Sequence, residues 1–150
     1  GGDLSLGNDY RHPNIAAVKD SSGNVAKMGE IVRSVRPDFQ VIAGSAGFLY
    51  PALCIGAIGG VLALANIAPQ QCCDILDYFR HGKHEDAKQL QLRMIAPNTA
   101  VTGKFGVPGL KAAMEMVGMY GGDPRSPMLP LNADQKETLR GILKGAGILS

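Results

Sequence analysis

The apolar residues of this chain fall into a few short clusters that are separated by segments with helical spacing. Two clusters, residues 15–18 and 40–43, are bounded by turn-forming residues, and a third covers residues 60–65. Short apolar runs bounded in this way are typical of buried strands. Elsewhere apolar residues recur three or four positions apart, which predicts helices over residues 25–35, 48–55, 69–82, 84–96 and 109–117 and a last one capped by Asn132.

The last helix has the clearest local signals. Asn132 and Gln135 have the spacing of a capping box, in which each side chain bonds to the backbone of the other residue. Leu139, Ile142 and Leu143 then form one apolar stripe. We therefore expect this helix to pack against the rest of the chain through that stripe.

The order of the elements predicts the fold class. Strand and helix alternate up to residue 83, and near-continuous apolar strands between helices favour a parallel sheet covered on both faces. Three strands are few, because doubly wound sheets usually have about five or more and a barrel has about eight in roughly 250 residues. We expect an α/β structure that forms the last part of something larger.

Composition excludes several classes of function. The chain has 150 residues, of which 45% are hydrophobic and 19% charged, and its net charge is +2 with histidine neutral. No dense Lys/Arg block is present, so a nucleic-acid partner is not expected. No run of about 18 apolar residues occurs, so we expect no membrane-spanning segment.

The three cysteines, Cys54, Cys72 and Cys73, are odd in number and two are adjacent. Neither CxxC spacing nor an accompanying His cluster is present, which argues against a zinc site. We expect buried, reduced thiols.

The first strand raises the main chemical question, because Lys19 follows it directly. In parallel α/β architectures active groups lie at the carboxyl ends of strands. Lys19 is either a residue whose stem reaches past the strand into water or a Schiff-base nucleophile. In the second case the apolar wall of residues 15–18 would desolvate the amine, which lowers the pKa of a lysine.

Small polar residues occupy equivalent places nearby. Ser21, Ser22 and Gly23 stand where the next helix begins, and they form either a helix cap or a seat for a carboxylate. Residues 44–47 (Gly-Ser-Ala-Gly) follow the second strand, where they form either a plain tight turn or a place where backbone approaches a ligand. Asn66 after the third strand is best explained as a turn residue or helix cap.

Three segments carry a resemblance to a known family: IAAVKDSSGN (15–24), VIAGSAGFLYPALCIGAIGGVLALAN (41–66) and KFGVPGLKAAMEMVGMYGGDPRSPMLPL (104–131). They resemble the C-terminal half of the dihydrodipicolinate synthase/N-acetylneuraminate lyase family, over about residues 12–150. Within it, the likeness is strongest to the mitochondrial aldolases that cleave 4-hydroxy-2-oxoglutarate. The resemblance implies a (β/α)8 barrel followed by a helical bundle.

On that template the chain divides into an irregular leader (residues 1–11), the last three strands of a partial barrel (12–83) and a C-terminal helical extension (84–150). Lys19 falls on the position of the imine-forming lysine. Ser21 resembles a contact to the substrate carboxylate, and Gly44 with Ser45 resembles the lining beside the imine.

The implied chemistry is class I retro-aldol cleavage of 4-hydroxy-2-oxoglutarate, a 2-oxo acid, to pyruvate and glyoxylate. The resemblance implies neither a metal nor an organic cofactor, because the lysine supplies the electron sink. It also implies a mitochondrial location and a homo-oligomer, usually a tetramer, or association with the missing half-barrel.

Other interpretations stay open. The family's first five strands, its Gly-rich carboxylate loop and its proton-relay tyrosine have no counterpart here, so we expect a truncated form with impaired catalysis. The chain is alternatively a non-catalytic fragment that associates with a full-length subunit. A third alternative is a pyruvate-dependent enzyme similar to dihydrodipicolinate synthase or N-acetylneuraminate lyase.

Overall fold

The first two strands lie side by side in a small parallel sheet. The computed structural model describes residues 11–150, so most of the expected leader lies outside the described residues. Strand β1 (Ala17–Asp20) pairs in parallel with β2 (Gln40–Ala43), and Lys19 stands opposite Ile42. A third segment extends the pairing, because the Ile58 amide donates to Val41 and the Val61 amide donates to Ala43, both at 2.9 Å. Ala43 and Gly60 form a parallel bridge there.

The structure corrects two of the strand predictions. The first strand begins two residues later than expected and continues to Asp20, so Lys19 lies within it and not after it. The predicted third strand over residues 60–65 is wrong: pairing involves residues 58–61, and Ala63–Asn66 form a short 3-10 helix in which Leu64 is fully buried. A short apolar run signals burial, but its periodicity does not distinguish a strand from a tight helix.

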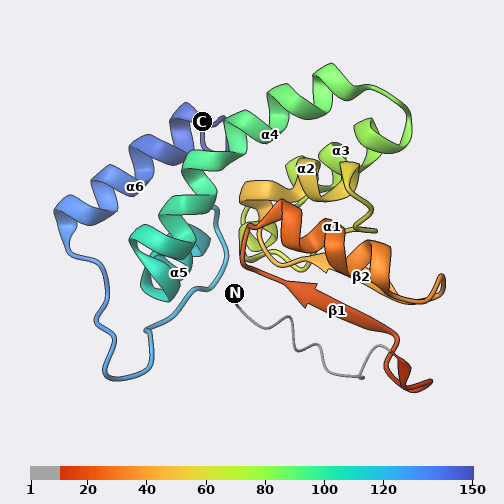
Figure 1. Ribbon diagram of the computed structural model, residues 1–150. Helices are drawn as coiled ribbons and strands as arrows, with labels where there is room; N and C mark the ends of the chain where they lie inside the picture. The colour runs from red at the N-terminus through yellow and green to blue at the C-terminus, as the bar shows by residue number, and fades with distance from the viewer. Residues whose placement is uncertain (1–10) are drawn as a thin grey trace.

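Six helices follow the predicted order within the described residues. They are α1 (Val25–Ser34), α2 (Leu49–Cys54), α3 (Pro69–Arg80), α4 (His84–Thr99), α5 (Gly106–Met116) and α6 (Ala133–Gly145). Figure 1 shows α4 running across the molecule, from the part that holds the strands and α1–α3 to the pair formed by α5 and α6. Helix α4 contacts both parts, and its side chains also bond to the segment that follows β2.

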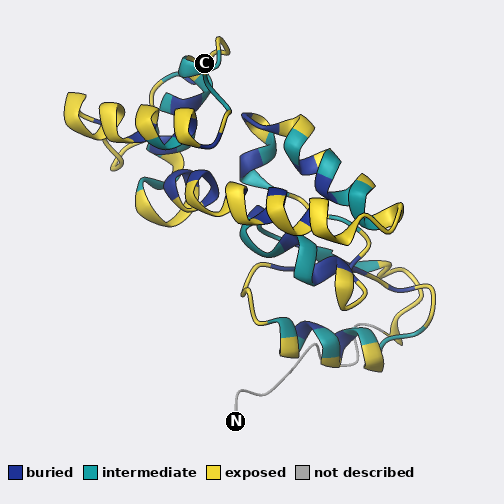
Figure 2. Cartoon of the chain, turned by 90° about the horizontal axis from the view of Figure 1, so that it is seen from above, coloured by how far each residue is buried: buried dark blue, intermediate teal, exposed yellow. Residues whose placement is uncertain are grey.

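One hydrophobic core extends through both parts of the chain. Val41 and Ala43 of β2 are buried in it together with residues from the helices, among them Met28, Leu49, Ile75, Met94 and Leu139. The buried positions form stripes along the helices, with exposed residues on their outer sides (Figure 2). Hydrophobic burial of this kind is the main favourable contribution to folding.

The capping box is confirmed, because Asn132 Oδ1 accepts from the Gln135 amide at 2.9 Å and Gln135 Oε1 accepts from the Asn132 amide at 3.0 Å. Leu139 and Leu143 are fully buried, as the apolar stripe predicts. The predicted end of α4 at residue 96 is wrong, because the helix continues through Pro97 to Thr99 and then into a π-helical turn, Ala100–Lys104. Among the described residues, no helix is both long and apolar enough to cross a membrane.

Candidate active site at the end of the sheet

Lys19 extends from the face of β1 that the helices do not cover. Side chains alternate between the two faces of a strand, and paired residues of parallel strands share a face. Val41 and Ala43 point into the core, so Ile42 and its partner Lys19 point the opposite way. Lys19 is exposed and Ile42 is half-buried. The expectation of a sheet covered on both faces, with a desolvated amine, is therefore not met by residues 11–150.

The residue after Lys19 accounts for part of the polar cluster. Asp20 is only 7% exposed, and its carboxylate accepts from the Ser22 hydroxyl at 2.6 Å and the Ser22 amide at 2.9 Å. Lys27 of α1 lies 3.4 Å from the other carboxylate oxygen. The Ser22 hydroxyl and amide, which the sequence suggested as donors to a substrate carboxylate, therefore already donate to Asp20. The cap of α1 is Asn24, whose side chain accepts from the Lys27 amide at 2.9 Å.

These contacts keep Asp20 ionised. Burial on its own raises the pKa of a carboxyl group. Here the two hydrogen bonds from Ser22 and the nearby Lys27 ammonium outweigh burial and lower the pKa of Asp20 below its ordinary value. The loop after β1 is therefore fixed around an internal negative charge.

Ser21 and Gly44, two of the predicted site residues, are brought together. The Gly44 amide donates to the Asp20 carbonyl at 2.7 Å, which continues the pairing of the strands by one residue. A Cβ atom on Gly44 would collide with Ser21 Oγ and lie 2.9 Å from the Asp20 carbonyl oxygen. Only glycine permits this approach of the two strand ends without displacement, whereas the approach of a ligand to the Gly44 backbone stays a prediction.

Ser45 begins the 3-10 helix Ala46–Phe48 and is tied to two other segments. Its Oγ accepts from the Gly47 amide at 3.2 Å and from Asn98 Nδ2 of α4 at 3.0 Å. Ser45 is half-buried, whereas Asn98 is only 5% exposed. Ser45 is therefore held in place by α4, although it remains accessible.

Sequence reasoning missed two residues of α4 that hold this segment. Gln91 is 5% exposed; its side chain donates to the Ala46 carbonyl and accepts from the Tyr50 amide, both at 2.8 Å. Asn98 lies seven residues further along, on the same face of the helix. The sequence signal for them is that Gln91 and Asn98 lie on the helix face that carries the apolar residues Ala87, Leu90 and Met94. Because the helix was expected to end before Pro97, Asn98 was not assigned to that face.

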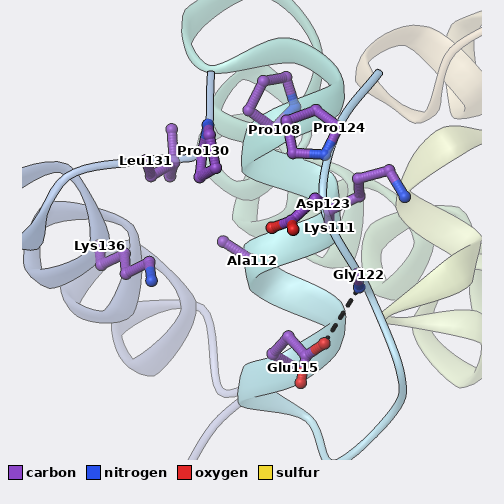
Figure 3. A pocket seen from close by; sticks show the side chains of 10 residues that line it. All are labelled: Pro108, Lys111, Ala112, Glu115, Gly122, Asp123, Pro124, Pro130, Leu131 and Lys136. Atoms are coloured by element: carbon purple, nitrogen blue, oxygen red, sulfur yellow. Dashed lines mark hydrogen bonds between the residues drawn. The ribbon is translucent and has the colours of Figure 1, made fainter. Parts of the chain in front are cut away.

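A cavity of about 160 Å³ lies elsewhere, between α5, α6 and the segment that connects them. Figure 3 shows Lys111 and Glu115 of α5 and Lys136 of α6 around it. Lys111 Nζ donates to the Gly121 carbonyl at 2.7 Å, and Glu115 Oε1 accepts from the Gly121 and Gly122 amides at 2.8 and 3.1 Å. The amide of Gly122 and that of Gly121 lower the pKa of Glu115. These charges hold the connecting segment, and the cavity contains none of the predicted site residues.

Within residues 11–150 no group of three or more histidine, cysteine, aspartate or glutamate side chains is placed to hold a metal ion. At the end of the sheet, Lys19 provides an amine that can act as a nucleophile, and Ser21 and Ser45 provide hydroxyl groups that can form hydrogen bonds.

Comparison with known proteins places this geometry in a wider context. Residues 7–146 match the Dihydrodipicolinate synthetase family. Two curated proteins named 4-hydroxy-tetrahydrodipicolinate synthase illustrate the sequence likeness. The one from Caldicellulosiruptor saccharolyticus is 36% identical over 136 residues, which cover 91% of this chain and 46% of that protein. The one from Methanopyrus kandleri is 30% identical over 96% of this chain and 47% of that protein.

The fold agrees with a solved structure of the same kind. The dihydrodipicolinate synthase DapA-2 from Bacillus anthracis superposes with a TM-score of 0.84 at 28% identity, covering 91% of this chain and 47% of that one. The chain thus spans about half the length of the curated relatives that it matches.

Proposed function

The chain belongs to the dihydrodipicolinate synthetase family, and on that premise we propose that Lys19 forms an imine with a 2-oxo acid such as pyruvate. Members of this family are carbon–carbon lyases. The observation that carries the proposal is the position of Lys19 on the face of the sheet that no helix of residues 11–150 covers, with Ser21, Gly44 and Ser45 at the end of the same two strands.

The proposed reaction uses the amine as nucleophile and electron sink. The neutral Lys19 amine attacks C2 of the 2-oxo acid, and the C2 oxygen takes one proton from the nitrogen and one from solvent and leaves as water, which gives a protonated imine. In the cleavage direction the 4-hydroxyl gives its proton to solvent, the C3–C4 bond breaks and C4 leaves as the carbonyl carbon of an aldehyde, glyoxylate for 4-hydroxy-2-oxoglutarate. The electron pair of the broken bond moves into the imine, which becomes an enamine. Protonation of the enamine at C3 gives the pyruvate imine, which water hydrolyses. In the synthetic direction the enamine attacks an aldehyde instead.

The neighbouring residues suit a carboxylate beside the imine. Ser21 is an exposed residue, and its hydroxyl lies in the space that a side chain on Gly44 would occupy, at the end of the strand that carries Lys19. Ser45 adds a second hydroxyl at the next turn. Hydrogen bonds from hydroxyls to a charged carboxylate are stronger than bonds between neutral groups. We therefore assign substrate binding to Ser21, Gly44 and Ser45, and imine formation to Lys19.

Two reactions share this pyruvate imine. The names of the relatives favour synthesis of 4-hydroxy-tetrahydrodipicolinate from pyruvate and an aldehyde. Cleavage of 4-hydroxy-2-oxoglutarate to pyruvate and glyoxylate is the narrower hypothesis that the sequence suggested. Supplying pyruvate with an aldehyde in one assay and 4-hydroxy-2-oxoglutarate alone in another, and measuring the products of each, distinguishes the two.

The sheet itself supports a proposal about the assembled protein. Three parallel segments leave two edges unpaired within the described residues, and unpaired edges attract further strands. We infer that active protein is a (β/α)8 barrel in which further strands, from the same chain or from an associated one, cover the face of the sheet that carries Lys19. Homo-oligomer formation and a mitochondrial location remain predictions from the resemblance.

Exchange of the methyl hydrogens of pyruvate tests the proposed chemistry. Imine–enamine interconversion replaces these hydrogens by deuterium in D2O, so the pyruvate methyl signal in proton NMR declines. We expect this decline to require Lys19 and to vanish in Lys19→Arg, whereas Lys144→Arg, an exposed site on α6, retains it. Equal exchange by the wild type and Lys19→Arg would refute the proposal.

A further inference from the structure

Ser45 is left with a single hydrogen-bonding option. A hydroxyl group has one hydrogen to donate and two lone pairs that accept. The Gly47 amide and Asn98 Nδ2 fill both lone pairs of Ser45 Oγ. No residue in the described part of the chain accepts the Ser45 hydrogen. The hydroxyl of this half-buried residue is therefore a donor only.

Asn98 is held where it orients this hydroxyl. A Cβ on Gly47 would lie 2.9 Å from Asn98 Nδ2, so the glycine leaves the space into which the amide fits. The backbone carbonyl of Asn98 also accepts from Thr102 Oγ1 at 2.7 Å, which ties the residue to the π-helical turn. The amide therefore reaches Ser45 from a fixed position on α4.

The oxygen of the Asn98 side-chain amide accepts no hydrogen bond from the described residues. This atom, Oδ1, is buried. An unpaired buried acceptor costs about 1–3 kcal/mol, so a leucine of similar volume would serve packing at least as well. Gln91 differs, because both ends of its amide are paired. Gln91 is thus explained by structure alone, whereas Asn98 is not.

We propose that Asn98 is a positioning residue for Ser45: it fixes the hydroxyl as a donor to the carboxylate of a 2-oxo acid bound at the Lys19 end of the sheet. This inference rests on the proposed function for the identity of the ligand. It adds that substrate affinity depends on a residue of α4, which belongs to the helical extension and not to the sheet. Asn98 acts through Ser45 and does not itself react.

Binding of oxamate, an unreactive analogue of pyruvate, tests the inference without imine chemistry. We expect Ser45→Ala and Asn98→Leu each to weaken oxamate binding about tenfold in isothermal titration calorimetry, the effect of losing roughly one hydrogen bond to a charged group. The double variant should bind no more weakly than either single one. Thermal unfolding of Asn98→Leu should show little or no loss of stability, because the variant also removes the orphaned oxygen.

A purely structural role makes the opposite prediction, with lower stability and unchanged oxamate affinity in Asn98→Leu, and that result would overturn the inference. If Asn98→Leu does not fold, Asn98→Asp replaces it. Its carboxylate draws the Ser45 hydrogen away from the ligand, so the same loss of affinity is expected. Thr99→Asp, which adds the same charge at the adjacent exposed residue, is its control and should retain affinity.

The two proposals fail separately. If the variants bind oxamate more weakly but the wild type does not exchange the methyl hydrogens of pyruvate, imine formation is refuted and the role of Asn98 stands. If the wild type exchanges these hydrogens but all variants bind oxamate equally well, the role of Asn98 is refuted and imine formation stands. A wild type that binds no oxamate overturns the positioning role.

Discussion

Replacing Gly44 with alanine tests the close approach of the two strands at the candidate site. The new Cβ would collide with Ser21 Oγ and lie 2.8 Å from Ser21 Cβ and 2.9 Å from the Asp20 carbonyl oxygen. Ordinary contacts of a Cβ are 3.4–4 Å, so these neighbours must move by several tenths of an ångström. Ser21 can rotate its side chain, but the Asp20 carbonyl is fixed by the 2.7 Å bond from the Gly44 amide.

The expected loss of stability follows from these contacts. Overpacking costs about 1–3 kcal/mol, and weakening the strand bond adds up to about 1 kcal/mol. The smaller conformational freedom of alanine in the unfolded chain offsets about 0.4–1 kcal/mol. Together these three ranges span about 0–3.6 kcal/mol, and we expect the free energy of unfolding to fall by about 2 kcal/mol, near the middle of that span.

Urea-induced unfolding followed by circular dichroism measures the change. Gly59→Ala is the matched control, because Gly59 lies in the neighbouring paired segment and a Cβ there meets open space. It should be neutral or slightly stabilising. If both variants unfold at the same urea concentration, the close approach of Ser21 to Gly44 is contradicted.

Three further outcomes are expected. Asp20→Asn should lower stability at pH 7 by about 1.5–3 kcal/mol, since hydrogen bonds to a charged acceptor are lost. The pKa of Asp20 is lowered in the folded state, so the stability that its carboxylate contributes is present above the ordinary carboxyl pKa of about 3.9 and is lost as pH falls through the lower folded value. The free energy of unfolding, measured with urea at a series of pH values below about 5, should therefore depend less on pH in Asp20→Asn than in the wild type. An equal pH dependence in both proteins would contradict this. Gln91→Leu should cost about 2–4 kcal/mol in thermal or urea unfolding, because the Ala46 carbonyl and the Tyr50 amide lose their partner, whereas Gln89→Leu on the exposed side of α4 should be near neutral. Burial, followed by the adjacent Cys73, raises the pKa of Cys72 to about 11, so iodoacetamide at pH 8 should modify the exposed Cys54 and Cys73 first, and mass mapping that finds Cys72 modified equally fast would refute its burial.

Local signals in the sequence were sufficient for the helices and the order of elements. The capping box at Asn132 and the stripe of Leu139 and Leu143 depend on residues within two turns of one helix, so they are visible without the fold. The parallel pairing of the first two strands also follows from their apolar character and the helix between them. The third strand was misplaced because an apolar run around Leu64 fits a buried 3-10 helix equally well.

The site was harder to predict, because its contacts join distant parts of the chain. Ser45 and Asn98 are 53 residues apart, and the helical position of Asn98 was hidden by Pro97. Proline in a helix normally removes a hydrogen bond, but here α4 continues past Pro97 to Thr99 and a π-helical turn follows it. The Asp20 carboxylate as partner of Ser22 was likewise not foreseen, since both residues fit a helix cap.

The central claim is that Lys19, among all the lysines of this protein, forms an imine with pyruvate. The protein is incubated with pyruvate and sodium borohydride, which reduces an imine to a stable secondary amine, and the modified peptide is located by mass spectrometry. The account predicts a carboxyethyl group on Lys19 that is absent without pyruvate and is not found on exposed lysines such as Lys88 and Lys144. Modification spread evenly over the lysines, or absent from Lys19, would contradict it.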